Sequence, residues 1–235
     1  MQRKPKILIV EDEPAIRTGL VDVFVYHGHA VEWADDGERG LALALSGAFD
    51  LVLLDVMLPS RNGFDVLAAI RAHDREQPVI LLTAKATDED VIQGLTLGAD
   101  DYVAKPFSVA QLVLRVQAVL RRSGAFSREA SLIRLADGRD IDVANLAVAG
   151  DAELRFTRRE VEVLQYLAGC GERAVSREEL LHKVWGYARD SGIETRTVDI
   201  HIARLRRKLE PDPKQPLHLV TVRGGGYRLV TREAG

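Results

Sequence analysis

Acid and base side chains stand at the points where several short apolar segments of the chain end. Glu11 and Asp12 follow one such segment, Asp55 follows another, Thr83 a third and Lys105 a fourth. Apolar runs of about four residues that alternate with helical patterns are typical of parallel strands buried on both faces. Ligands bind such open sheets at the carboxyl edge of the strands. We therefore expect these five side chains to meet in one pocket.

The chemistry of this pocket would suit a divalent cation together with a phosphoryl group. Carboxylate oxygens are the protein ligands that Mg²⁺ prefers. The Asp55 carboxylate could attack phosphorus if a bound cation offset the repulsion between the two anions. The Lys105 ammonium would stabilise the transferred charge. The mixture of groups is the main indication of function in the sequence.

The first half of the chain alternates strand and helix patterns five times. The predicted strands are residues 6–10, 30–34, 50–55, 79–83 and 101–104. The predicted helices are residues 14–26, 37–46, 63–73, 88–97 and 108–122. Strand–helix alternation with short connections predicts a doubly wound α/β fold with a five-stranded parallel sheet.

The second half has a different pattern, which predicts an α+β domain. Residues 131–156 contain short strand patterns separated by turn signals, and Thr157 with Glu160 forms a capping box before a helix. A second capping box at Ser176 and Glu179 precedes another helix, and a third helix is expected at about 195–209. Two β-prone runs around Gly224–Gly226 predict a hairpin.

Charge is distributed unevenly over the 235 residues, whose net charge is −3. Residues 1–122 hold 13 basic and 18 acidic residues (net −5), whereas residues 123–235 hold 19 and 17 (net +2). An acidic front half and a basic tail favour a regulatory domain joined to a nucleic-acid reader. The single Cys170 excludes an intramolecular disulfide. No signal-peptide core and no apolar stretch of about 18 residues is present, so we expect a cytoplasmic protein without a membrane partner.

Residues 5–122 resemble the receiver domain of two-component response regulators. The matching segments are VEDEP at 10–14, LDVMLPSRNG at 54–63, LTA at 82–84 and GADDYVAKPF at 98–107. The resemblance implies that Asp55 is the phospho-acceptor and that Thr83 and Lys105 act on the phosphoryl group. It also implies Mg²⁺ as cofactor, held by Glu11, Asp12, Asp55 and the backbone carbonyl of Met57. Thr83 and Tyr102 would form the switch that reports phosphorylation, and a cis peptide bond is expected before Pro106.

The second half resembles the winged-helix effector domain of the OmpR/PhoB family. The matching segments are LRFTRRE at 154–160, ELLHKVW at 179–185, RTVDIHIARLRRKL at 196–209 and VRGGGYR at 222–228. The implied organisation is a flavodoxin-like receiver at 1–122, a linker at 123–130 and a winged helix-turn-helix domain at 131–235.

The third helix of this domain has one narrow apolar stripe, formed by Val198, Ile202, Leu205 and Leu209. We expect the stripe to face the core and the opposite face to enter the major groove of DNA. By resemblance, the DNA-binding residues are Arg196, Thr197, His201, Arg204 and Arg206 on the helix, with Thr221 and Arg223 in the wing.

The resemblance also implies a symmetric homodimer that forms on phosphorylation. In the family, the last receiver helix and the adjoining strand make salt bridges between subunits, here Asp101 with Arg115 and Asp100 with Arg122. The family commonly adds a Lys–Glu pair, but this chain has Val91 and Gln111 at those places. We therefore expect a dimer whose interface is weaker or shifted.

These features together predict a transcription factor that is controlled by phosphorylation. Its partners would be a sensor histidine kinase and double-stranded DNA, with RNA polymerase open as a third. We expect no enzyme, although Asp55 would take part in its own phosphoryl transfer and slow dephosphorylation. One alternative is a Mg²⁺-dependent phosphohydrolase, which would require an acid/base carboxylate two residues after Asp55, at the position of Met57. Another is a degenerate receiver that acts as a protein-binding module, which the complete set of pocket residues disfavours.

Overall fold

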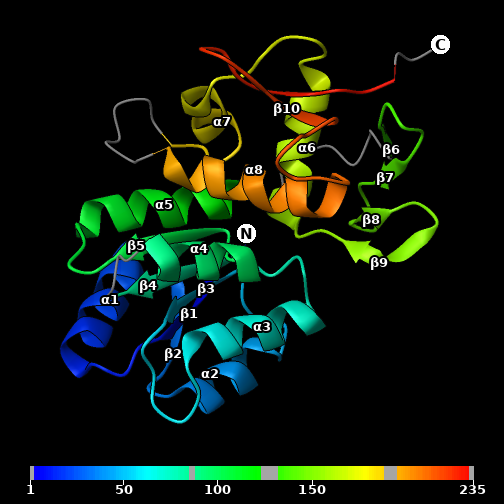
Figure 1. Cartoon of the computed structure of the whole chain (residues 1–235). Helices are drawn as coiled ribbons and strands as arrows, with labels where there is room; N and C mark the ends of the chain where they lie inside the picture. The colour runs from blue at the N-terminus through cyan, green and yellow to red at the C-terminus, as the bar shows by residue number, and fades with distance from the viewer. Residues whose placement is uncertain (1–2, 85–87, 123–131, 188–194, 233–235) are drawn as a thin grey trace. The chain divides into compact units, whose positions relative to one another are not determined.

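The computed structural model describes residues 3–84, 88–122, 132–187 and 195–232, with the side chains of residues 88–92, 121, 122 and 152 outside that description. The chain divides into two compact units, Met1–Ser123 and Gly124–Gly235 (Figure 1). The linker expected at 123–130 lies outside the described residues. Within the described ranges, every helix is too short or too polar to span a bilayer.

The first unit contains a five-stranded parallel sheet with the strand order β2-β1-β3-β4-β5. Its strands are β1 (Lys6–Val10), β2 (Ala30–Ala34), β3 (Leu51–Asp55), β4 (Val79–Thr83) and β5 (Asp101–Ala104). Its helices are α1 (Pro14–Tyr26), α2 (Gly37–Ala44), α3 (Gly63–His73), α4 (Asp88–Leu97) and α5 (Val109–Arg122). The predicted doubly wound sheet is confirmed. The strand order reverses between β1 and β3, and open sheets of this kind bind ligands at the carboxyl ends of the strands at such a point.

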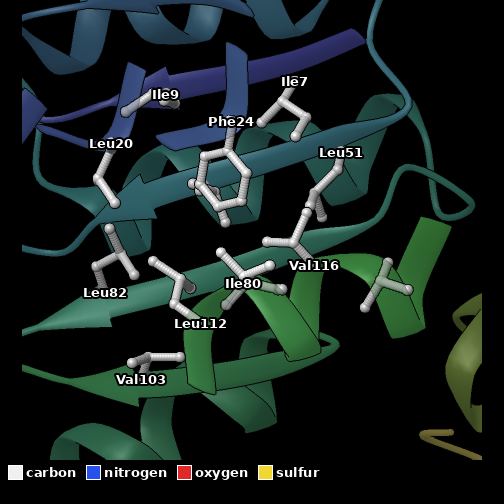
Figure 2. Packing of buried hydrophobic residues seen from close by; sticks show 13 residues of the cluster. Ile7, Ile9, Leu20, Phe24, Leu51, Ile80, Leu82, Val103, Leu112 and Val116 are labelled. Carbon is white, nitrogen blue, oxygen red and sulfur yellow. The ribbon is translucent and has the colours of Figure 1, made fainter. Parts of the chain in front are cut away.

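The core of this unit is built from the alternation of side chains along each strand. Ile7 and Ile9 of β1 lie on the face that α1 and α5 cover, where they pack with Phe24 and Val116 (Figure 2). The other face meets α2, α3 and α4. There, a Cβ at Gly40 of α2 would lie 2.5 Å from a Val10 methyl. The helix can therefore pack this closely against β1 only with glycine at position 40. Burying a large apolar side chain stabilises by about 1.5–3 kcal/mol, so the strand ends are held firmly.

The second unit combines two antiparallel sheets with three helices. A four-stranded sheet holds β6 (Leu132–Arg134), β7 (Asp140–Asp142), β8 (Ala147–Val148) and β9 (Asp151–Arg155), and a hairpin holds β10 (Leu219–Val222) and β11 (Gly226–Leu229). The helices are α6 (Arg158–Gly169), α7 (Arg177–Lys183) and α8 (Arg196–Leu209). The predicted helix-turn-helix with a terminal hairpin is therefore confirmed.

Local signals account for most of these boundaries. Thr157 and Glu160 make both bonds of the predicted capping box at the start of α6. At α7 only half of the predicted box is formed: Ser176 accepts from the Glu179 N–H, but the Glu179 carboxylate binds Tyr166 and Arg173 instead. The contact with Tyr166 of α6 therefore replaces the second bond of the local motif.

Candidate functional site

Three of the predicted pocket residues form one connected ionic cluster at the carboxyl edge of the parallel sheet. Glu11 follows β1, Asp55 ends β3 and Lys105 follows β5. The Lys105 Nζ lies 2.6 Å from the Asp55 Oδ2 and 2.7 Å from the Glu11 Oε2. Glu11 and Asp55 are buried, so water screens these contacts little.

Asp12 adds a third carboxylate to this cluster. Oxygen atoms of Glu11, Asp12 and Asp55 lie within 4.8 Å of one another. Three acidic groups around a single ammonium leave the cluster with an excess of negative charge. Carboxylate oxygens at this spacing are the donor set that a hard divalent cation requires, so the residues present fit such an ion. A structural role alone would favour equal numbers of acids and bases.

The pKa values of Glu11 and Lys105 follow from burial and from the charges and hydrogen bonds of their neighbours. Burial raises the pKa of Glu11, the Lys105 hydrogen bond opposes this in part, and the Asp55 charge raises it further. Burial acts to lower the pKa of Lys105, but the hydrogen bonds and charges of Asp55 and Glu11 outweigh it, so this pKa is raised. Lys105 therefore holds its positive charge firmly, while Glu11 ionises less readily than an exposed glutamate.

Backbone contacts near Asp55 hold its carboxylate and the start of α3 in position. The Met57 N–H donates to the Asp55 Oδ1 at 3.1 Å. A Cβ at Gly63, the first residue of α3, would lie 2.1 Å from the Asp55 carbonyl oxygen, so only glycine permits this approach. The Lys105–Pro106 bond is cis, as expected. The Met57 carbonyl as a cation ligand stays a prediction.

The expected switch pair occupies neighbouring strands. Thr83 is buried at the end of β4, beside the strand of Asp55, and its carbonyl accepts from the Lys105 N–H at 2.7 Å. Tyr102 is half-buried on β5, paired in register with Leu81. Thr83 therefore lies at the carboxyl edge of the sheet and Tyr102 on the adjacent strand, and their role as a switch stays a prediction.

In the second unit, α8 buries the apolar stripe predicted for it. Val198, Ile202, Leu205 and Leu209 are at most 1% exposed. Ala203 and Arg207 are exposed, whereas Arg196 and Arg206 are half-buried. The helix therefore has a core face and a solvent face, which a groove-binding helix requires.

The core face of α8 is wider than predicted, and it includes residues expected on the DNA-facing side. The buried His201 ring packs edge-on against Trp185, with ring centroids 5.0 Å apart, and its Nδ1 lies 2.9 Å from the Thr197 carbonyl oxygen. The Arg204 Nε lies 2.9 Å from the fully buried Glu160 carboxylate. The structure thus turns His201 and Arg204 towards partners in their own unit. Contacts of these residues and Thr197 with DNA stay a prediction.

Arg206 of α8 binds two groups of the hairpin. Arg206 donates from Nε to the Leu219 carbonyl at 2.8 Å and from Nη2 to the Thr221 hydroxyl at 2.7 Å. Two residues predicted to touch DNA, Arg206 and Thr221, therefore bind each other. Arg223 is exposed at the end of the hairpin, where the predicted wing contact requires it.

Comparison with known proteins matches both units. Residues 7–117 match the family described as response regulator receiver domain, and residues 151–229 match the family described as transcriptional regulatory protein, C terminal. Sensory transduction protein RegX3 of Mycobacterium tuberculosis is 41% identical and covers 95% of this chain and 98% of its own length. The chain belongs to the OmpR/PhoB-type response regulators. It is a two-component response regulator that acts on DNA, and it is of the non-enzymatic transcription-factor kind.

Solved structures agree with this membership. A RitR mutant aligns with a TM-score of 0.74 at 28% identity, covering 97% of this chain and all of the other. DrrB, an OmpR/PhoB homologue of Thermotoga maritima, aligns with a TM-score of 0.52 at 32% identity, covering 97% of this chain and all of DrrB.

The acidic residues predicted at the dimer interface of this response regulator have partners within the chain. Asp101 forms an ion pair with Arg115. Asp100 accepts from Arg71 at 2.9 Å and from the Val79 N–H at 2.8 Å. Salt bridges between subunits would therefore have to share these carboxylates with their partners inside the chain. The side chains of Arg122 and Val91 lie outside the described part of the chain, and Gln111 is exposed.

Arg71 and Arg17 were missed by sequence reasoning, and Glu160 was recognised only as a helix cap. The capping box announced that Glu160 begins α6. Its two cations, Arg204 and Lys208, come from a helix more than forty residues later, so only the fold reveals the pairing. Arg17 gave no signal beyond its place early in α1.

Proposed function

We propose that Asp55 accepts a phosphoryl group from a sensor histidine kinase, in a Mg²⁺-dependent reaction, and that this modification controls DNA binding. The observation that carries the proposal is the contact of the Lys105 ammonium with the Asp55 carboxylate beside the Glu11–Asp12 pair. A buried nucleophile, a charge-stabilising cation and a cation-binding donor set occupy one crevice, as phosphoryl transfer requires.

The roles of the chain's own residues follow from their positions. An Asp55 oxygen forms a bond to phosphorus while the bond from phosphorus to the donor nitrogen breaks. Lys105 then contacts a phosphoryl oxygen, and the Thr83 hydroxyl donates to another. Glu11, Asp12, Asp55 and the Met57 carbonyl would hold Mg²⁺, which when bound offsets the repulsion between carboxylate and phosphate. The same crevice would release phosphate from Asp55 slowly by hydrolysis.

The modification changes the charge at the end of β3, and we propose that a homodimer is the response. Phosphorylation adds negative charge and acceptor oxygens, towards which Thr83 moves while Tyr102 turns inward. The α5 face, with Asp101 and Arg115, then pairs with a second copy. Two winged helices are thereby placed on adjacent half-sites of a promoter, where RNA polymerase is a further partner. Membership of the response regulator family supports a cytoplasmic location for the protein.

The test is phosphorylation of the full-length protein with a small phosphodonor and Mg²⁺. We expect labelling of the wild type and its loss in Asp55→Asn, because the amide is not a nucleophile. Asp22→Asn, which removes an exposed carboxylate from α1, is the matched control and should label normally. Undiminished labelling of Asp55→Asn would refute the assignment. Sedimentation of the labelled wild type then measures dimerisation.

A further inference from the structure

One basic side chain of α1 lies against the turn that carries two of the pocket carboxylates. The Arg17 Nη1 donates to the Glu11 carbonyl at 2.8 Å and to the Asp12 carbonyl at 2.9 Å. It binds the backbone of these residues rather than their carboxylates. A single guanidinium nitrogen therefore ties together the two consecutive peptide units whose side chains enter the acidic cluster.

The guanidinium is itself oriented by an aromatic ring. The Arg17 guanidinium carbon lies 4.6 Å from the centroid of the Trp33 ring on β2, and Arg39 of α2 lies 5.1 Å from the same centroid. Trp33 is paired in register with Ile9, two residues before Glu11. Guanidinium planes stack favourably on indole faces. The ring therefore fixes the direction in which Arg17 presents its donors.

The turn also contains the bond from the Glu13 N–H to the Glu11 Oε1 at 3.3 Å, and it begins where the sheet ladder ends. The Glu11 N–H donates to the Ala34 carbonyl at 3.0 Å, which continues the β1–β2 ladder by one residue. Beyond that point the ladder ends, and the chain turns towards Pro14 at the start of α1. Arg17 holds the carbonyls of the residues at which the backbone leaves the sheet.

We propose that Arg17, oriented by Trp33, is a positioning residue for the divalent-cation site: it holds the turn so that the Glu11 and Asp12 carboxylates converge with Asp55. The proposal rests on the cation binding assumed in the proposed function. The sign of the effect is diagnostic. A positive charge near a cation site weakens cation binding by repulsion. Positioning strengthens it, so removing Arg17 changes the affinity in opposite directions under the two roles.

The experiment is a calorimetric titration of the unphosphorylated full-length protein with Mg²⁺ at fixed ionic strength. We expect Arg17→Ala to weaken Mg²⁺ binding about tenfold, as loss of a residue supporting metal ligands typically does. Arg17→Lys, which keeps the charge but loses the planar stack, should fall between wild type and Arg17→Ala. Trp33→Leu leaves every charge unchanged, so a weaker affinity in a folded variant reflects the positions of groups and not the loss of a charge.

Arg3→Ala is the matched control, because it removes an equal charge whose partner, Asp50, precedes β3 at the other end of the strand from Asp55. It should leave the Mg²⁺ affinity unchanged. Urea unfolding in EDTA should show that the receivers of Trp33→Leu and Arg17→Lys are still fully folded without urea, so that a weaker Mg²⁺ affinity reflects positioning and not unfolding. Arg17→Ala or Trp33→Leu binding Mg²⁺ as tightly as the wild type, or more tightly, would overturn the positioning role alone. A wild type that binds no Mg²⁺ would overturn the proposed function as well.

Discussion

Each unit contains a fully buried glutamate, and the pKa values of the two glutamates are shifted in opposite directions. Glu11 of the receiver and Glu160 of the DNA-binding unit are both 0% exposed. Burial raises the pKa of Glu11, and the neighbouring Asp55 charge adds to the effect. Burial also acts to raise the pKa of Glu160, but the charges of Arg204 and Lys208 outweigh it and the pKa is lowered.

The difference lies in the balance of charge around each carboxylate. Glu160 has two cations, with the Lys208 Nζ 2.7 Å away, and it also accepts from the Thr157 N–H at 2.7 Å. Glu11 shares the single ammonium of Lys105 with Asp55. Equal burial therefore accompanies opposite roles. A neutralised carboxylate stabilises a fold, and an under-neutralised one is suited to bind a cation.

Glu160→Gln should give the largest loss of stability, about 3 kcal/mol, because it leaves two cations beside a buried neutral group. Urea unfolding followed by the fluorescence of Trp185, in a Trp33→Phe background, measures the stability of the DNA-binding unit. A loss below about 1 kcal/mol would show that Arg204 and Lys208 find other partners, and the contrast with Glu11 would fail.

His201 should make the DNA-binding unit sensitive to mild acid. Burial lowers the pKa of His201 from 6.5 to about 4, and nearby Arg204 and Arg159 act in the same direction. Between these two pH values the His201 imidazole is therefore protonated in the unfolded chain and neutral in the folded unit. Stability falls as the pH falls, by about 2 kcal/mol between about pH 7 and pH 5. Unfolding of the wild type and His201→Phe at both pH values checks this, since the variant should lose most of the slope.

Arg223→Ala should weaken binding to a target duplex about tenfold without changing stability, because Arg223 is exposed in the turn of the hairpin. Arg204→Ala should weaken binding and also destabilise its unit, because Glu160 then loses one of its two cations. Mobility shifts at several salt concentrations measure both effects, and loss of a phosphate contact lowers the salt slope by about 0.9. Arg134→Ala, an exposed change on β6, is the control of equal charge. Equal binding by all three variants would contradict the reader assignment.

Glu11→Gln should have the smallest effect on stability, below about 1 kcal/mol in EDTA, because it removes a carboxylate that repels Asp55 while Lys105 keeps Asp55 as partner. Urea unfolding of the receiver measures the change. A loss as large as that of Glu160→Gln would show that Glu11 is a structural ion-pair partner, and the comparison would no longer distinguish the two sites.

Much of the fold and part of the site could be predicted from local pattern. The apolar runs of β1 and β3 located Asp55 at a strand end, and the Thr157 capping box located the start of α6. The cis bond before Pro106 was expected from resemblance alone. The strand ends and the helix start depend on residues close together in the chain, whose spacing is visible in the sequence.

The direction of individual charged and polar side chains could not be predicted in the same way. An exposed face was expected for His201, but the ring packs on Trp185, which is contributed by the segment after α7. Helical periodicity gives the angle of a residue around its helix, but not how far neighbouring elements wrap around that helix. The half-formed box at Glu179 has the same origin, since Tyr166 of α6 supplies the competing partner.

The sequence by itself determined the order of strands and helices, the presence of an acid-rich strand edge and the apolar stripe of α8. Only the tertiary structure decided how many cations surround each glutamate. Glu11 shares one cation with Asp55, whereas Glu160 has two, and Arg17 donates to backbone carbonyls rather than to the carboxylates. Periodicity and capping are short-range. The free energy of a buried charge instead depends on every group that the fold brings within a few ångströms and on the water it excludes.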